Sequence, residues 1–348
     1  MSTTVETAKN TEYQVFIDAD NKRYNVSKAV ISLDTSEQEK QLAVCATIEL
    51  CDVEVDGQRL SDLIFPPNRV WIFVHDSEKD SNREVFRGYI WEISPKESLT
   101  DNNISLKCYD MLIYWQESED SIFFSAGRDT QGIMKELAKN WGFSLTYNYE
   151  NKVHEKLVLR GAIADFVIAD ILDPMQKEFG TKYVIRSEKT SVIISPVGQN
   201  DTVYTIGMSH NATEVRRYIS MNGVITQVIV LGTADDDDKS PIEATVTGHT
   251  SSYGTLQKII TKNEDTDLRT SKIEAKNIVD NEGTPKWEHD IKAVDIPWIR
   301  KGDKVEITTE TLNGTFIVLG VNREISNRGK NMTLTVIKGD TEYAASNP

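Results

Sequence analysis

The residue types that most often carry catalysis occur in this sequence without catalytic spacing. Five histidines lie far apart, and none forms an HExxH pair or a His/Cys cluster with metal-ligand spacing: His75, His154, His210, His249 and His289. No Gly-rich loop ends in Lys and Ser or Thr, the pattern that cradles phosphates. We therefore predict no catalytic residue, no cofactor-binding residue and no metal site.

The candidate nucleophiles and carboxylates also lack a clear catalytic pattern. Residues 207–211 resemble the turn that presents a nucleophilic serine, but Asn211 stands where that turn requires a glycine. The 54 acidic residues offer many chance pairs, and sequence spacing does not fix their separation in space, so sugar hydrolysis stays open. The four aspartates at 235–238 lack the alternating ligands, glycine and distal glutamate of an EF-hand loop. We interpret that run as a solvated linker.

Four tryptophans could form a sugar-binding platform, but each lies in an apolar pattern that predicts packing in a core or an interface: Trp91, Trp115, Trp141 and Trp298. A cell-wall hydrolase and a carbohydrate-binding receptor protein therefore remain the alternatives to a structural role. Peptidoglycan cleavage would distinguish the first, and binding to cell-surface glycans would distinguish the second.

Composition describes an ordinary globular chain long enough for two or three domains. The 348 residues are 39% hydrophobic and 27% charged, and no apolar run is long enough to span a bilayer. The first ten residues are too polar for a signal peptide, which predicts synthesis in the cytoplasm. A net charge of −15 with scattered cations predicts no sequence-specific binding to nucleic acid. Three cysteines without paired spacing predict reduced, packed thiols.

A β unit occurs twice, and this internal repeat dominates the organisation of the chain. Each copy has an apolar alternation, an aromatic strand start at Phe86 or Phe316, a glycine at Gly88 or Gly320, and a second strand after a polar loop. Chance similarity between antiparallel strands is the alternative. Because glycine is unfavourable inside a strand, we expect both glycines where a side chain would collide with a neighbouring strand or subunit.

The elements between the copies differ in kind. Asp129 or Thr130 can cap a helix that Gly142 stops, a second helix is predicted from residue 163 with Pro174 interrupting it, and residues 182–195 predict a hairpin. The predicted fold is mainly β with an α+β insert: two tube-like antiparallel β-barrel domains flank a smaller α+β domain. The predicted limits are a disordered tail 1–12, a first β domain 13–118 with a returning segment 212–233, an insert 119–211, an acidic linker 234–241 and a second β domain 242–348.

Several motifs in shared order resemble the baseplate hub proteins of PBSX-like defective prophages, the XkdQ/YqbQ type. They span most of the chain from about residue 13 to 337: residues 86–91, 106–115, Phe123-Phe124 before the capped helix, 252–257 and 298–305. The residues predicted to serve assembly come from the repeat and from the last of these motifs: Gly88, Glu92, Trp298, Gly302, Asp303, Gly320 and Glu324.

The resemblance implies a structural hub in a contractile phage tail or a tail-like bacteriocin. Such a protein forms a homo-oligomeric ring, expected to be a homotrimer, that joins the tail tube protein to the spike protein. Further implied partners are a LysM-type hub-associated protein and wedge or tape-measure proteins, with no membrane. The implied location is the baseplate of the virion or particle. No spike or hydrolase domain is recognisable up to Pro348, so a penetrating tip is expected to be a separate subunit.

Overall fold

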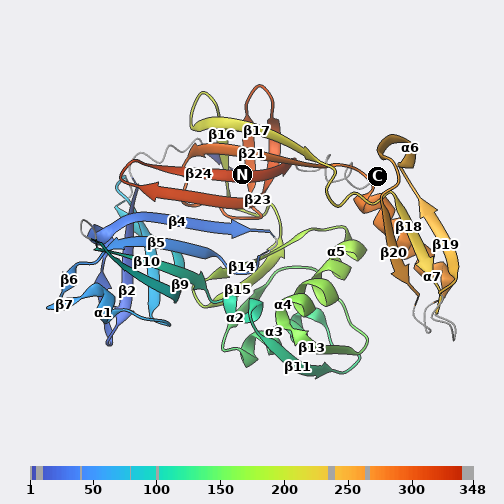
Figure 1. Cartoon of the computed structure of the whole chain (residues 1–348), viewed down its shortest axis with the longest axis horizontal. Coiled ribbons are helices and arrows are strands. Elements are labelled where there is room, and N and C mark those ends of the chain that lie inside the picture. The colour runs from blue at the N-terminus through green and yellow to red at the C-terminus, as the bar shows by residue number, and fades with distance from the viewer. Residues whose placement is uncertain are drawn as a thin grey trace. The chain divides into compact units, whose positions relative to one another are not determined.

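The computed structural model describes residues 2–4, 11–39, 41–78, 80–98, 102–233, 240–262 and 267–338. The chain divides into two compact units (Figure 1). The first contains residues 1–215 and 291–336, and the second contains residues 216–290 and 337–348. Among the described residues, every helix is too short or too polar to cross a membrane. The four aspartates at 235–238 lie outside the described residues.

The first unit contains a large sheet whose first half is a run of six neighbouring strands. In spatial order they are β4 (Val30–Gln38), β5 (Cys45–Cys51), β10 (Asn102–Asp110), β9 (Ser81–Glu97), β8 (Arg69–Asp76) and β2 (Thr11–Ala19). β3 (Lys22–Asn25) adds to β2 at the edge. Side chains alternate between the two faces, so that Ile17, Ile72 and Leu106 point into one core. The short helix α1 (Leu60–Leu63) buries Leu60 in the same core.

The second half of the sheet repeats this strand order. It runs β17 (Ala212–Ser220), β21 (Lys286–Val294), β24 (Gly329–Lys338), β23 (Asn313–Ser326), β22 (Lys304–Thr308) and β16 (Thr202–Gly207). Residues 216–220 of β17 and 286–290 of β21 belong to the second unit. The strands of the two halves correspond in position. Phe86 of β9 pairs with Ile72 of β8, and Phe316 of β23 pairs with Val305 of β22. One strand differs in direction: β2 is antiparallel to β8, whereas β16 is parallel to β22. The duplication predicted from the sequence is therefore present in the fold.

β4 and β23 join the two halves of the sheet side by side (Figure 1). Residues 32–38 of β4 pair antiparallel with residues 320–326 of β23. β22 occupies the same side of β23 only at residues 313–317, which leaves the rest of that edge for β4. A second core lies behind this half, formed by side chains such as Phe316, Val318 and Leu334.

The α+β insert has a core of its own. It comprises α2 (Ile113–Gln116), β11 (Glu119–Phe124), α3 (Thr130–Asn140), β12 (Ser144–Tyr147), β13 (Leu157–Ala162), a continuous helical segment, β14 (Tyr183–Glu188) and β15 (Ser191–Pro196). Asp129 caps α3 by accepting a hydrogen bond from the Gly132 amide at 2.9 Å, and Gly142 follows with φ +72°. The helical segment is α4 (Ile163–Asp165), the π-helical η2 (Phe166–Leu172) and α5 (Asp173–Phe179). Pro174, which cannot donate a helix hydrogen bond, follows directly on the π-helical turns of η2.

The second unit is a small three-stranded sheet with a helix on one face. β18 (Gln227–Leu231) lies between β19 (Ile242–Thr247) and β20 (Gln257–Thr261). Ala275 and Val279 of α7 (Leu268–Glu282) pack on Val228 and Val230. The remaining elements of the chain are minor: β1 (Ser2–Thr4), η1 (Ser27–Ala29), β6 (Glu54–Val55), β7 (Gln58–Arg59) and α6 (Thr250–Tyr253).

The strand pairing differs from the predicted domain limits in four places. The predicted second β domain 242–348 divides between two sheets, because β19 and β20 belong to the small sheet and β21 to β24 belong to the large one. Residues 2–4 of the predicted tail form β1, which pairs with β16, and residues 11–12 already belong to β2. Residues 202–207, predicted in the insert, form β16 of the second half. The returning segment 212–233 contributes β17 to the second half and β18 to the small sheet. Strand periodicity marks where a strand runs but not which strand it pairs with, so the sequence left these assignments open.

Candidate functional site

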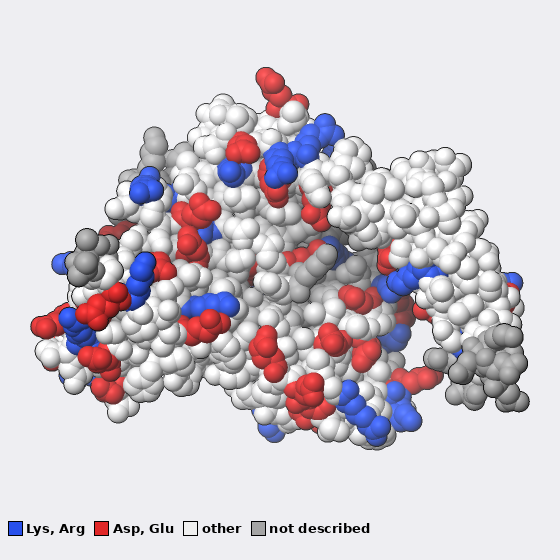
Figure 2. All heavy atoms as spheres, in the orientation of Figure 1, with Lys and Arg blue, Asp and Glu red and all other residues white. Residues whose placement is uncertain are grey.

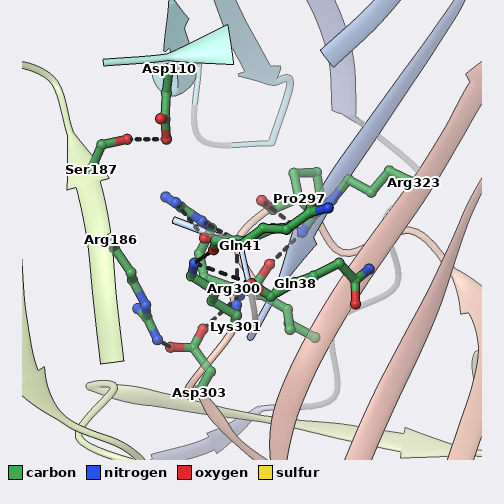
Figure 3. A network of polar contacts seen from close by, with 12 residues as sticks. Gln38, Gln41, Asp110, Arg186, Ser187, Pro297, Arg300, Lys301, Asp303 and Arg323 are labelled. Carbon is green, nitrogen blue, oxygen red and sulfur yellow. Dashed lines mark hydrogen bonds and ion pairs between the residues drawn. The ribbon is translucent and has the colours of Figure 1, made fainter. Parts of the chain in front are cut away.

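A cluster of buried charged side chains lies where the loop 295–303 meets β4, the end of β10 and the insert (Figure 3). Six of its members are at most 7% exposed: Glu37, Asp110, Asp295, Lys301, Asp303 and Arg323. Buried charge is unfavourable unless it is matched and hydrogen-bonded. The contacts that match each of these charges therefore matter for the stability of the fold.

Glu37 and Arg300 form the central pair. Two nitrogens of the Arg300 guanidinium donate to the Glu37 carboxylate, Nε at 2.7 Å and Nη2 at 2.8 Å. Burial alone would raise the pKa of the Glu37 carboxyl, but the charge and hydrogen bonds of Arg300 lower that pKa to about 2. The carboxylate therefore stays ionised throughout the neutral range.

The Lys301 side chain forms hydrogen bonds with the end of β4 and the loop that follows it. Its Nζ donates to the main-chain carbonyls of Gln41 at 2.7 Å, Gln38 at 3.3 Å and Leu42 at 3.4 Å. Burial lowers the pKa of this amine, and the nearby Glu37 and Asp110 charges oppose that shift. Three carbonyls thus replace the water that the ammonium loses on burial.

Asp303 fastens the insert to the same loop. Arg186 of β14 donates to its Oδ1 at 2.6 Å, and the Arg300 amide donates to its Oδ2 at 2.8 Å. Gly302, with φ +79°, packs so closely that a Cβ there would lie 2.8 Å from the Val184 side chain. The glycine is required both for its backbone conformation and for this close approach.

Two further carboxylates extend the cluster into both halves of the sheet. The Ser187 hydroxyl donates to Asp110 Oδ2 at 2.5 Å, and burial raises the pKa of Asp110 to about 6. Arg323 Nε donates to Asp295 Oδ1 at 2.9 Å, and the Tyr13 hydroxyl donates to Asp295 Oδ2 at 2.5 Å. Arg323 also donates to the Ile299 carbonyl.

The cluster is balanced in charge and connects three cores. It contains four cations, Arg186, Arg300, Lys301 and Arg323, and four carboxylates, Glu37, Asp110, Asp295 and Asp303. No net charge is left to act on a ligand. Within the part of the chain that the structure describes, no group of three His, Cys, Asp or Glu side chains could hold a metal ion. The arrangement can fix domains to one another, and we name it the buried junction.

The structure brings only two of the seven predicted assembly residues into the buried junction, Gly302 and Asp303. Trp298 lies beside it, half-buried, with the Arg83 guanidinium 4.8 Å above its ring. Glu92 is exposed and pairs with Lys107 at 3.1 Å. Glu324 is exposed and faces Asp34 across the β4·β23 seam, where burial and then the Glu324 charge raise the pKa of Asp34.

The two marker glycines differ in surroundings. A Cβ at Gly88 would overlap the main-chain carbonyl of Tyr109, whereas a Cβ at Gly320 would meet the flexible end of the Gln38 side chain. Gly88 lies two residues after Phe86 and Gly320 four residues after Phe316, so the two glycines are not equivalent positions. Sequence reasoning missed Glu37, Arg300 and Lys301. A charged residue on the inward face of β4, in line with the buried Leu33, was the available signal for Glu37.

Both halves of the fold and the insert occur together in proteins of phage tails. A 43 kDa prophage MuSo2 tail protein from Shewanella oneidensis has a TM-score of 0.69 at 12% identity, with 94% of this chain and 98% of that chain covered. A tail protein from Neisseria meningitidis has a TM-score of 0.68 at 13% identity, covering 97% and 100%. An Escherichia coli type VI secretion component has a TM-score of 0.55 at 10% identity, covering 90% and 75%. The fold is therefore that of this class of tail and secretion proteins.

The model of the YQBQ-like family matches residues 74–337. The chain belongs to the YQBQ-like family, as the motifs in its sequence indicated. No curated protein matches it.

Proposed function

We propose that this chain is the structural baseplate hub subunit of a contractile phage tail or tail-like particle. Three copies form a ring that joins the tail tube to the central spike. Its location is the assembled particle. Family membership and the fold shared with tail proteins support the tail assignment.

The observation that carries the proposal is the repeated six-strand order. Each chain presents two corresponding sheet segments, fixed to each other by the β4·β23 seam and the buried junction. We take these segments as the tube-like domains. Three chains with two segments each offer six similar positions to a sixfold tube and a true threefold face to a trimeric spike. The tail tube protein and the spike protein are the proposed main partners. LysM-type, wedge or tape-measure proteins are the proposed additional partners.

Copy number in the assembled particle tests this proposal. An averaged reconstruction of the baseplate should show three copies, with the segments that carry Gly88 and Gly320 alternating around the lumen. Six copies per ring would contradict it.

A cell-wall hydrolase and a carbohydrate-binding receptor are the alternatives. The charge-balanced buried junction offers no free acid or base, and the surface charges in Figure 2 are scattered. Zymography on cell walls should therefore show no cleared band, and purified surface glycans should not bind. A cleared band that disappears on replacing one carboxylate would establish the first alternative.

A further inference from the structure

One face of the α+β insert exposes an apolar pair of side chains. β11 and β13 form a two-stranded ribbon in which Phe123 lies directly opposite Val158 (Figure 1). Phe123 is 62% exposed and Val158 is 37% exposed, although the next residues along the chain, Phe124 and Leu159, are buried in the insert core. Side chains alternate along a strand, so the ribbon has one buried face and one exposed face. The exposed one, the ribbon face, consists of Glu119, Ser121, Phe123, Lys156, Val158 and Arg160.

Two cations flank the apolar pair on the ribbon face. Lys156, which directly precedes β13, and Arg160 stand two residues before and two residues after Val158, and both are exposed. Among the described residues neither takes part in an ion pair, whereas Arg128 and Lys152 of the insert each pair with a glutamate. On a chain with a net charge of −15, these two cations are therefore free to attract a negatively charged partner.

The other charge on the ribbon face lies away from the apolar pair. Glu119 stands at the far end of β11, opposite Ala162, and Ser121 stands opposite Arg160. The part of the face around Phe123 and Val158 is thus positive and apolar together. A partner that fits it must offer an apolar side chain between two negative charges.

The ribbon also has room for a further strand. Among the described strands, β11 and β13 pair only with each other, so each keeps one edge without a strand partner. An extended segment that pairs with β13 places every second side chain on the ribbon face, opposite Lys156, Val158 and Arg160. Opposite charges across such a pair are stabilising.

We propose that the ribbon face binds an extended acidic segment of a partner protein. The segment lies along β13 and carries a carboxylate, an apolar side chain and a second carboxylate at alternate positions. The carboxylates meet Lys156 and Arg160, and the apolar side chain covers Val158 and Phe123. This surface lies on the insert, and its function does not depend on how many copies form the ring.

A segment of this kind fits the ribbon face better than phosphates do. Nucleic acid binds through many cations that each neutralise a phosphate, and a chain of net charge −15 with two cations on this face opposes that contact. Binding to anionic lipid likewise needs a cluster of about four to eight cations. The alternate spacing of cation, apolar side chain and cation matches the side-chain period of a strand instead.

Fluorescence anisotropy with synthetic peptides and the full chain tests this surface. The probe is a labelled, end-capped peptide with the order Thr-Asp-Thr-Leu-Thr-Glu-Thr, which should bind saturably and more weakly as salt is added. Replacing its leucine by serine should weaken binding about tenfold, because the apolar contact is lost. Phe123→Ser in the protein should have a similar effect.

Charge reversal on the protein gives the second arm of the test. Lys156→Glu with Arg160→Glu should weaken binding of the acidic peptide by about tenfold or more, because two attractions become repulsions. A peptide with lysine in place of both acids should bind this variant and not the wild type. The matched control is Lys135→Glu with Lys139→Glu on α3, which changes the net charge equally at exposed positions and should bind like the wild type.

Three outcomes would overturn the inference. The first is that the wild-type chain does not bind the acidic peptide. The second is that the charge-reversed variant and the control bind it equally well. The third is that phosphatidylglycerol vesicles or single-stranded DNA bind the wild-type chain more tightly than the peptide does, which would assign the face to phosphates. None of these measurements involves the assembled ring, so the proposed hub function stands or fails separately.

Discussion

Replacing Glu37 by Gln tests whether the buried junction holds the first unit together. The substitution keeps the shape of the side chain but removes its charge, and it leaves the Arg300 guanidinium without a carboxylate. Removing one partner of a buried ion pair is strongly destabilising because the other charge stays buried.

The magnitude follows from the pKa of Glu37. Its carboxyl shifts from an ordinary value of 4.5 to about 2. At roughly 1.4 kcal/mol per pH unit, the folded state stabilises the ionised form by about 3 kcal/mol. Because the folded-state pKa is the lower one, this stability is fully present above pH 4.5. It is lost as the pH falls towards 2.

Urea unfolding followed by tryptophan fluorescence measures the effect. Five of the six tryptophans lie in the first unit, so the signal reports mainly on the unit that contains the pair. Glu37→Gln should lower the free energy of unfolding at pH 7 by about 3 kcal/mol, with a smaller acid dependence between pH 4.5 and 2. Glu37→Met with Arg300→Met should recover much of that loss.

The matched control is Glu92→Gln. Its ion pair with Lys107 has side-chain exposures of 62% and 42%, so its loss should change the free energy of unfolding by less than about 1 kcal/mol. The reasoning is refuted if Glu37→Gln unfolds like the control. It is also refuted if the double Met variant is as unstable as the two single changes added together.

Three further outcomes are expected. Burial raises the pKa of Asp110 to about 6, so its ionisation opposes folding as the pH rises from 4 to 6. Asp110→Asn should remove that slope and should not destabilise the protein at pH 7.5, as urea titrations at several pH values would show. Gly88→Ala should destabilise by about 1–3 kcal/mol because its Cβ meets the Tyr109 main chain, while Gly320→Ala should be milder because Gln38 can move; calorimetry showing equal effects would contradict this. Alkylation of the native protein followed by mass spectrometry should modify the exposed Cys51 and spare the fully buried Cys108, and modification of Cys108 without denaturant would show that the core opens.

The sequence predicted the secondary-structure elements and the internal repeat better than it predicted which strands pair with each other. The cap at Asp129 and the hairpin of β14 and β15 were recognisable because capping residues and turns are local signals. The assignment of β16, β17 and β18 was not, because a strand's partner depends on segments far away in the chain. β18 and β17 are separated by only six residues, yet they belong to different sheets.

The buried junction was predictable only in part, for a related reason. Gly302 and Asp303 belong to a recognisable motif, but the motif does not say which of its side chains turn inward. Arg300 and Lys301 are ordinary surface types, and their burial depends on Glu37 and on carbonyls about 260 residues earlier. Contacts of that separation leave no spacing signal in a single sequence.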